Sequence, residues 1–322
     1  MSEEDETIEC AICMEVIIED DDKKSLDCKH AFHSGCIIKW ASQKSNCPMC
    51  RTPINELFQA HAQAIVISIA LSAGIRTIYD SAYYNNDRLA NVVCPDTLIT
   101  IQNEAFRGCK SLANISLSNN LTNIGKMAFY ECYSLAEIVL PNSLISIGSM
   151  AFQFCTALNN IVLPIGLTEI LGNAFFMCSS LTNIVIPPNI TTINACTFYG
   201  CDSLTSVIFP DNLITIRENA FYGCTSLTNI VLPGNLKSIG SSAFSECDLI
   251  TNIVIPNGVT SIGVWAFKNC ASLTSIVLPD SIEHIGDQAF SGCVSLKNVV
   301  LPPKLNPIYK NTYYGLRRIN MC

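Results

Sequence analysis

The chain has 322 residues, of which 49% are hydrophobic and 14% are charged, and its formal net charge is −8. That length is enough for more than one domain with its own hydrophobic core. An acidic chain without a basic stretch that also carries aromatic residues argues against nucleic acid as the main partner. The charge is uneven, because residues 1–56 hold 12 acidic and 6 basic side chains. We interpret residues 1–9 as a solvated acidic tail.

Residue types that bind zinc dominate the segment after this tail. The eight candidate ligands are Cys10, Cys13, Cys28, His30, His33, Cys36, Cys47 and Cys50. Zinc takes thiolate and imidazole donors in tetrahedral groups of four, and short spacings let one turn supply two ligands. Eight donors make two closed sites, which predicts two structural Zn²⁺. The alternative is that the two Cys-x2-Cys pairs are chance neighbours in a cysteine-rich chain.

The order of these ligands narrows the class. Residues 10–51 resemble a RING-H2 finger, with three cysteines, two histidines and three cysteines in sequence. The resemblance implies a small α+β cross-brace domain with interleaved ligand sets: Cys10, Cys13, His33 and Cys36 for one zinc, and Cys28, His30, Cys47 and Cys50 for the other. It also implies an E3 ubiquitin ligase, which binds a ubiquitin-charged E2 conjugating enzyme and ubiquitin and has no catalytic cysteine of its own.

Four further positions match the contact residues of that family. By resemblance, Ile12, Trp40 and Pro48 line the groove for the E2 enzyme, and Arg51 is the basic "linchpin" that contacts the enzyme and ubiquitin together. A small patch centred on an aromatic residue suits a transient interface, and a guanidinium can bridge two carbonyl-bearing surfaces. The alternative is an inert zinc scaffold, in which Trp40 is a core residue and Arg51 a solvated one.

A linking segment follows the zinc ligands. Thr52 as N-cap, Pro53 at the first helical position and Gly74 past the end predict a helix over 52–73 that covers the open end of the next domain. Residues 57–75 are uncharged, which raises the alternative of membrane insertion. Polar residues interrupt this run, so we expect no membrane span.

The remainder, residues 74–322, is an internal repeat. Phenylalanine recurs every 23 residues at Phe106, Phe129, Phe152, Phe175, Phe198, Phe221, Phe244, Phe267 and Phe290, and Tyr83 and Tyr313 extend the series. A cysteine follows each phenylalanine by three residues. A fixed period in the twenties with several apolar columns is typical of a leucine-rich solenoid, in which stacked rungs share one core.

Within a rung, the segment Leu-x-x-Ile-x-Leu-Pro, such as Leu135–Pro141, is the best strand candidate, because proline ends a strand. The segment Ile-Gly-x-x-Ala-Phe, such as Ile239–Phe244, is expected to be rich in turns. This unit resembles the BspA-like leucine-rich repeat. The resemblance implies a curved right-handed solenoid with a parallel sheet on its concave face.

The cysteine column admits two interpretations. Stacked thiols could form disulfides, as in a secreted protein. However, each cysteine occupies the same inward register, the first residues lack a secretory signal, and thiolate zinc ligands need a reducing compartment. We therefore expect reduced core thiols in an intracellular, cytoplasmic protein.

One outward row of the predicted strands is a candidate surface for a substrate protein. It consists of Val139, Val162, Val185, Ile208, Val231, Val254, Val277 and Val300. An exposed apolar stripe of this length is unusual in a soluble monomer. The alternative is that β-branched residues were kept for strand propensity, and the similarity of the rungs weakens the case for specific recognition.

Together these observations predict an intracellular RING-type E3 ubiquitin ligase that recruits an unknown substrate protein through its solenoid. Two alternatives remain: a non-catalytic zinc-finger and leucine-rich-repeat scaffold, and a surface adhesion protein. The sequence contains no phosphate-binding loop, nucleophile elbow or paired carboxylates with supporting histidines that would indicate other chemistry.

Overall fold

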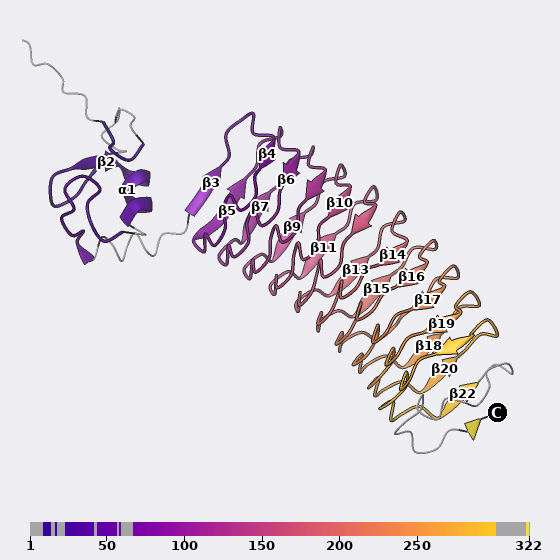
Figure 1. Cartoon of the computed structure of the whole chain (residues 1–322). Coiled ribbons are helices and arrows are strands. Elements are labelled where there is room, and N and C mark those ends of the chain that lie inside the picture. Colours follow the sequence, from indigo (N-terminus) through magenta and orange to yellow (C-terminus); the bar gives the residue numbers. More distant parts are fainter. Residues whose placement is uncertain are drawn as a thin grey trace, which may run out of the picture. The chain divides into compact units, whose positions relative to one another are not determined.

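The structure is a computed structural model, and it describes the residues numbered 9–13, 17, 23–41, 44–56, 58, 67–300 and 320–321. The chain divides into two compact units, Met1–Val66 and Ile67–Cys322. Figure 1 shows a small first unit that contains a hairpin and a helix, and a second unit built from stacked strands.

The first unit contains a short antiparallel hairpin followed directly by a helix. Strands β1 (Lys23–Ser25) and β2 (Ala31–His33) pair with Lys24 opposite Phe32, and helix α1 (Ser34–Ala41) begins at the next residue. The buried side chains of its described residues form two small clusters: Cys10, Phe32, Ile37 and Cys47, and Ala41 with Ile54. A core this small gives little hydrophobic stabilisation, so metal binding must supply much of the folding free energy.

The second unit is a solenoid in which most rungs contribute one strand to each of two walls. The long-strand wall is formed by the Leu-x-x-Ile-x-Leu-Pro segments; its strands are β3 (Ile67–Ala70), β5 (Leu89–Val93), β7 (Asn114–Ser116), β9 (Glu137–Val139), β11 (Asn160–Val162), β13 (Asn183–Val185), β15 (Ser206–Ile208), β18 (Asn252–Val254), β20 (Ser275–Val277), β22 (Asn298–Val300) and β23 (Asn320–Met321). All the pairings in this wall are parallel, and they fall into four sheets.

A second wall, called the short-strand wall here, is formed by two-residue strands that end at the isoleucine five residues before each core aromatic residue. They are β4 (Thr77–Ile78), β6 (Thr100–Ile101), β8 (Asn123–Ile124), β10 (Ser146–Ile147), β12 (Glu169–Ile170), β14 (Thr192–Ile193), β16 (Thr215–Ile216), β17 (Ser238–Ile239), β19 (Ser261–Ile262) and β21 (His284–Ile285). The sequence predicted only turns here. Thr-Ile and Ser-Ile pairs suit a pleated surface, and in this register each pairs with its equivalents in neighbouring rungs.

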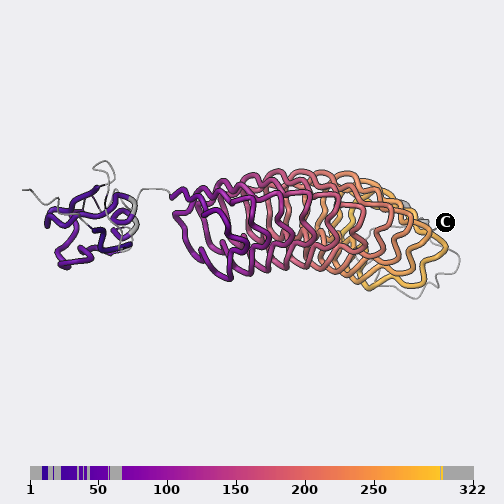
Figure 2. Tube along the Cα trace, turned by 90° about the horizontal axis from the view of Figure 1, so that it is seen from above, coloured from indigo at the N-terminus to yellow at the C-terminus, as the bar shows by residue number. Residues whose placement is uncertain are grey.

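The third side of each rung, for example residues 240–250, contains turns and is called the turn side here. The three sides enclose the core, and the Cα trace in Figure 2 shows rungs of similar shape following one another. The prediction of a leucine-rich-repeat solenoid with parallel strands is confirmed, with two strand walls in place of one. Tyr313 and the residues from 301 to 319 lie outside the described residues.

The predicted start of the linking helix is wrong. Thr52 and Pro53 are not helical, and Pro53 forms an antiparallel bridge with Asn46. Helical backbone is present at Phe58, whose N–H donates to the Asn55 side-chain oxygen at 3.3 Å. Asn55 thus has the N-cap role that the sequence analysis gave to Thr52, because its short side chain can accept a hydrogen bond from the first helical turn.

The predicted end of that helix is also wrong. Ile67–Ala70 forms β3, which pairs in parallel with β5. The open edge of a solenoid offers unpaired backbone groups, and extending the sheet with β-branched residues satisfies them. Residues 59–66 lie outside the described residues. Among the residues that the structure describes, no helix is both long and apolar enough to cross a membrane.

The phenylalanine column forms one continuous stack through the solenoid. Consecutive rings from Tyr83 to Phe290 lie 5.2–5.7 Å apart between centroids with interplanar angles of 2–11°. The Phe rings are fully buried. Such offset pairs add stabilisation beyond the burial of their area. The column therefore joins every rung to the next.

The cysteine column satisfies the backbone next to this stack. Each thiol of the column donates to the carbonyl of the core aromatic residue one rung earlier, which is Tyr83 for Cys109 and a phenylalanine for the others; for example, Cys155 Sγ lies 3.2 Å from Phe129 O. Every cysteine among the described residues is a free thiol. Burial raises the pKa of Cys155 and of Cys178 well above the ordinary value, so both remain protonated near neutral pH.

Alkylation tests this arrangement. In the native, zinc-loaded chain at pH 8, we expect iodoacetamide to modify Cys155 and Cys178 about 100-fold more slowly than in urea, because only the thiolate reacts and burial disfavours it. Peptide mass spectrometry of timed samples gives the rates. Native labelling at the unfolded rate, or a disulfide between column cysteines, would contradict the assignment.

A second test concerns the close approach of neighbouring rungs. A Cβ atom at Gly148 would lie 2.5 Å from the carbonyl carbon of Gly125, whereas one at Gly234 would meet nothing within 4 Å. We expect Gly148→Ala to lower the free energy of unfolding by about 2 kcal/mol or more, and Gly234→Ala to change it by less than about 0.5 kcal/mol. Denaturant titrations followed by circular dichroism measure both; equal effects would show that the rungs can separate freely.

Candidate metal centres and interaction surfaces

Eight cysteine and histidine side chains come together in two groups. Their donor atoms lie within 4.8 Å of one another in each group; the members are Cys10, Cys13, His33 and Cys36, and Cys28, His30, Cys47 and Cys50. Cys13 Sγ lies 3.2 Å from His33 Nδ1, and Cys47 Sγ lies 3.7 Å from His30 Nδ1. Donors on one tetrahedral zinc are about 3.5–3.8 Å apart at ordinary bond lengths. The geometry therefore fits one Zn²⁺ in each group.

The two groups alternate along the chain, which is the interleaved pairing that the resemblance implied. Cys28 and His30 lie in the turn of the β1–β2 hairpin, His33 ends β2, and Cys36 lies in the first turn of α1. Lys29, between the first two, has a φ of 67°, and its N–H donates to Leu26 O at 2.8 Å. This tight turn places two ligands of one group beside the strand that supplies a ligand of the other.

Hydrogen bonds favour the metal-binding thiolate form at one cysteine of each group. Burial alone would raise the pKa of Cys10, but hydrogen bonds from the backbone of Cys13, His33 and Ile12 lower it to about 6. Hydrogen bonds from the side chain and backbone of Thr52 lower the pKa of Cys50 to about 6. With four protein donors in each group, no open position is left for substrate, so the two Zn²⁺ are structural cofactors.

The proposed E2-contact residues lie next to the zinc ligands. Ile12 and Trp40 are partly exposed and pack against the buried cluster that contains Phe32 and Ile37. The indole N–H of Trp40 donates to Asn46 O at 2.7 Å, which fixes the ring at the end of α1. Pro48, also partly exposed, directly follows a zinc ligand. Trp40 thus combines the core role of the alternative interpretation with an accessible edge.

Arg51 is exposed at the end of the turn that carries the last two ligands. Its φ is 63°, in the left-handed region, and its N–H donates to Cys47 O at 3.0 Å. Cys47 N–H in turn donates to Thr52 O at 2.8 Å. The backbone on both sides of Arg51 is therefore held by the zinc-binding turn, while its guanidinium remains available to a partner.

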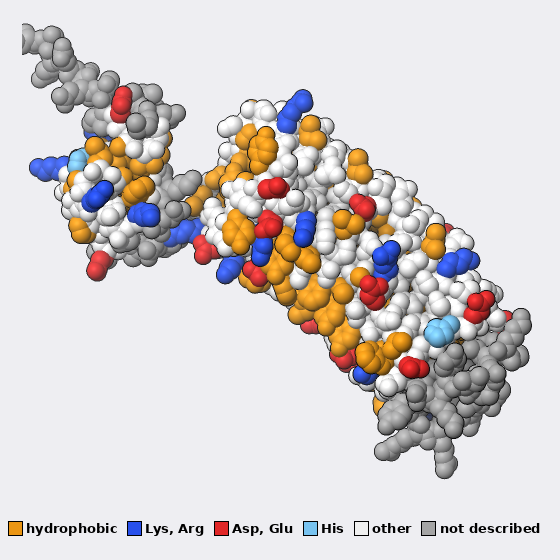
Figure 3. Space-filling model, viewed as in Figure 1, with side chains coloured by type: hydrophobic (Ala, Val, Ile, Leu, Met, Phe, Trp, Pro, Cys, Tyr) orange, Lys and Arg blue, Asp and Glu red, His pale blue; other side chains and the backbone are white. Residues whose placement is uncertain are grey.

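The outward row of the long-strand wall is exposed as expected. Its exposed fraction ranges from 50% at Val277 to 83% at Val139, and Val162, Val185, Ile208, Val231 and Val254 lie between these values. The side chain of Val300 lies outside the described residues. Hydrophobic side chains also gather in bands on the face of the second unit shown in Figure 3.

A second apolar surface, on the turn side, was missed by the sequence analysis. Phe176, Tyr199 and Tyr222 are partly exposed and stack in sequence with centroids 4.6 Å apart. They occupy the position directly after the core phenylalanine, where other rungs have Arg, Tyr, Gln, Ser or Lys. The signal that could have found them is this variation at a fixed position of an otherwise uniform repeat.

Zinc removal separates the stabilities of the two units. We expect a strong chelator to remove two zincs per chain and to unfold the first unit, whose own core is small, while the solenoid keeps its strands. Hydrogen exchange read by mass spectrometry should show lost protection at residues 23–41 and unchanged protection at 100–290. Full protection of the first unit after zinc loss would contradict a structural role for the metal.

Comparison with protein families agrees with this geometry. The model described as "BspA type Leucine rich repeat region (6 copies)" matches residues 76–205 and 191–320. The model described as "Ring finger domain" matches residues 8–51.

Curated proteins named as RING finger proteins match this chain over short stretches. RING finger protein 24 of Homo sapiens is 41% identical over 54 residues, which are 17% of this chain and 36% of that protein. RING-H2 finger protein ATL33 of Arabidopsis thaliana is 37% identical over 62 residues, 19% of this chain and 26% of that protein. E3 ubiquitin-protein ligase RNF181 of Danio rerio is 36% identical over 47 residues, 15% of this chain and 30% of that protein. The chain thus spans roughly a third of these relatives or less.

Solved structures match the other part. A leucine-rich repeat protein from Bacteroides ovatus superposes with a TM-score of 0.68 and 31% identity, over 74% of this chain and 63% of that one. A leucine-rich repeat protein from Eubacterium ventriosum, at 21% identity and a TM-score of 0.54 over 74% of this chain and 67% of that one, shares the fold. The chain belongs to the BspA-type leucine-rich repeat family and carries an N-terminal RING-H2-type zinc finger with two structural Zn²⁺.

Proposed function

We propose that the chain is a RING-type E3 ubiquitin-protein ligase, which binds a ubiquitin-charged E2 enzyme through its zinc finger and a substrate protein through its solenoid. The observation that carries the proposal is the pair of interleaved four-donor zinc groups, in a segment that resembles proteins named as E3 ligases. An intracellular, cytoplasmic location goes with it, because thiolate ligands and buried free thiols persist in a reducing environment.

The zinc finger would act by positioning. Ile12, Trp40 and Pro48 offer a small, partly exposed patch on a surface that zinc holds rigid, and such aromatic-centred patches dominate transient interfaces. Docking there would bring the E2–ubiquitin thioester next to Arg51. The guanidinium could then donate to carbonyl groups of the enzyme and of ubiquitin at once.

The chemical step would take place on the E2 enzyme. A lysine amine of the substrate attacks the thioester carbonyl, an amide forms, and the E2 cysteine leaves as the thiolate while the amine loses a proton. Holding the flexible conjugate in one attack geometry removes part of the entropic barrier. This role requires no catalytic cysteine of the chain itself, and zinc would serve only to hold the surface.

The solenoid would supply the substrate. Its valine row is an exposed apolar surface on the long-strand wall. A substrate bound there would be held on the same chain as the docked E2 enzyme. Tethering raises the local concentration of acceptor lysines without any new contact at the reacting atoms. Binding of the E2 enzyme by one unit and of the substrate by the other is consistent with the two compact units of the chain.

Reconstituted ubiquitin transfer with a panel of E2 enzymes tests the proposal. Wild type should build ubiquitin chains or modify itself. We expect Ile12→Ala to weaken E2 binding and Arg51→Ala to slow transfer, each by about tenfold or more in rate. Lys24→Ala, an exposed change on β1, is the matched control and should transfer normally.

Zinc content and melting temperature must be equal among the variants for the comparison to hold. If the zinc-loaded wild type fails to transfer ubiquitin with every E2 enzyme of the panel, the ligase proposal fails and the zinc finger acts as a binding scaffold. If Arg51→Ala transfers normally while Ile12→Ala does not, Arg51 has no linchpin role.

A further inference from the structure

Side chains that differ between rungs gather on the turn side of the solenoid. The valine row is Val or Ile from residue 139 to residue 277. The position after each core phenylalanine is instead occupied by Arg107, Tyr130, Gln153, Phe176, Tyr199, Tyr222, Ser245, Lys268 and Ser291. A surface can prefer one partner over another only where its chemistry changes from place to place. Specificity is therefore better placed on the turn side than on the valine row.

The middle of the turn side is apolar. Residues 148–193, two full rungs, contain a single charged residue, Glu169, which lies on the short-strand wall. Partly exposed aromatic and methionine side chains occupy the turn side there and in the preceding rung. We call them the aromatic–methionine patch: Met127, Tyr130, Met150, Phe154, Phe176 and Met177. Methionine adapts its shape to different partners, and such side chains are frequent on binding surfaces.

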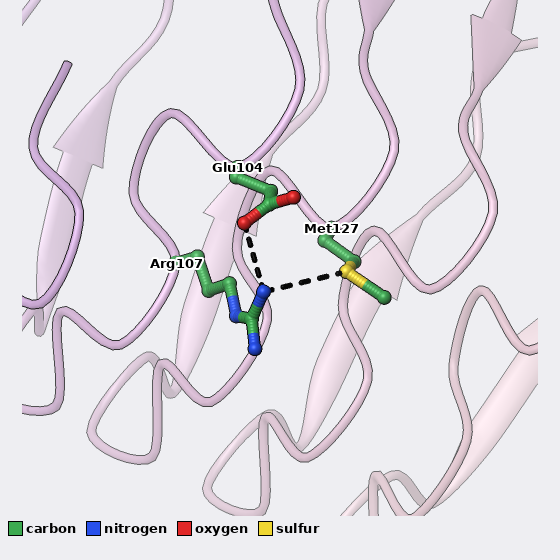
Figure 4. Close-up of polar contacts among 3 residues, drawn as sticks. All are labelled: Glu104, Arg107 and Met127. Atoms are coloured by element: carbon green, nitrogen blue, oxygen red, sulfur yellow. Dashed lines mark hydrogen bonds and ion pairs between the residues drawn. The ribbon is translucent and has the colours of Figure 1, made fainter. Parts of the chain in front are cut away.

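Contacts join this patch from rung to rung. Phe154 meets Tyr130 and Phe176 edge to face, at 5.6 and 5.7 Å between centroids. At the N-terminal end, the Arg107 guanidinium lies 5.1 Å from the Tyr130 ring centre and 4.0 Å from Met127 Sδ. Figure 4 shows one guanidinium nitrogen of Arg107 in contact with both Met127 and Glu104, and the contact with Glu104 is an ion pair at 2.8 Å. The paired charges leave this end of the patch nearly neutral.

One turn-side position of the patch differs in side chain from the other rungs. Phe154 and Met177 occupy it with φ values of 63° and 58°, in the left-handed region. This backbone conformation belongs to the repeat, because the equivalent residue of each rung from Asn85 to Gly292 has a positive φ. The other occupants are glycine, asparagine or glutamate: Gly108, Gly200, Gly223, Gly292, Asn85, Asn269, Glu131 and Glu246. Among the described rungs, Phe154 and Met177 are therefore the two large apolar side chains at this position.

The C-terminal side of the patch is acidic. Residues 194–249 contain five acidic and two basic residues. Glu246 accepts a hydrogen bond from Tyr222 Oη at 2.8 Å. This contact places a carboxylate at the C-terminal end of the stack of Phe176, Tyr199 and Tyr222. Asp202 and Glu218 belong to the turn sides of the intervening rungs. A complementary partner would therefore place basic groups beyond its apolar side chains.

We propose that the aromatic–methionine patch binds an extended protein segment that has apolar side chains in its centre and Lys or Arg at one end. The distance from the Tyr130 rung to the Glu246 rung is five rung steps, or roughly 25 Å, which an extended segment of about seven or eight residues spans. The proposal rests on the proposed function in one respect, because it names the feature by which a substrate would be recognised. The binding itself requires no ubiquitin.

Selection from a phage-displayed library of random peptides of about twelve residues tests this on the full-length, zinc-loaded chain. We expect enriched peptides with an apolar centre and a basic end. Synthetic copies should bind the double variant Phe154→Gly/Met177→Gly at least about tenfold more weakly in fluorescence anisotropy. Glycine is the residue that other rungs use at this position, and the melting temperature of the variant verifies that it is folded.

Ile145→Thr, at a half-exposed residue directly before β10, lies outside both the patch and the valine row; it is the matched control and should bind the same peptides as wild type. The proposal is overturned if selection enriches no peptide, if the peptides carry an acidic end, or if the folded double variant binds within about twofold of wild type. It is also overturned if Val162→Thr abolishes binding, which would place the site on the valine row. A failed ubiquitin-transfer assay would not change this readout, so the two proposals fail separately.

Discussion

The constant 23-residue length of the rung is the constraint on which the solenoid depends. Neighbouring rungs approach so closely that a single methyl group at Gly148 would collide with the backbone of Gly125. The ring stack and the bonds from each thiol to the carbonyl one rung earlier hold the same register. An insertion of one residue in a rung would shift all three interactions at once. The chain can therefore vary only at positions that point away from this core.

This constraint arranges the surface in rows. Equivalent positions of successive rungs lie side by side, so any outward position becomes a line of side chains along the stack. The valine row repeats one chemistry, whereas the turn side changes from charged to aromatic to acidic along its length. The position of Phe154 and Met177 also varies in side-chain size, because four other rungs have glycine there. The core phenylalanine and cysteine columns are constant because the rungs stack through them. The rungs therefore differ mainly in their surface residues.

Much of this architecture could be predicted from the sequence, for physical reasons. The spacing of cysteine and histidine predicts two zinc sites of four donors, because the metal accepts only a few donors at fixed distances, and the resemblance to RING-H2 fingers implies which ligands form each site. The phenylalanine and cysteine columns predict the core, since a 23-residue period brings them together in every rung. The helix over 52–73 was wrong, because β-branched residues at an open sheet edge gain more from pairing than from helix formation. The second strand wall was missed because strands of two residues leave no alternating pattern.

The aromatic–methionine patch escaped prediction for a different reason. The repeat is defined by its constant positions, whereas the residues of the patch differ from their equivalents in other rungs. Its residues also become neighbours only through stacking, since Tyr130 and Phe154 are 24 positions apart in the sequence, and Phe154 and Phe176 are 22 apart. The structure shows their ring contacts and the left-handed φ of Phe154, and neither can be read from one rung alone.

In the proposed function, the zinc-held surface and the solenoid act on one substrate but by separate physical means, rigid positioning and tethering. The first of these is the central claim, and single-turnover discharge of an E2–ubiquitin thioester onto free lysine measures it directly. The zinc-loaded chain should accelerate discharge by about tenfold or more, with no ubiquitin bound to any of its own cysteines. No acceleration, or a ubiquitin thioester on a cysteine of this chain, would contradict the account.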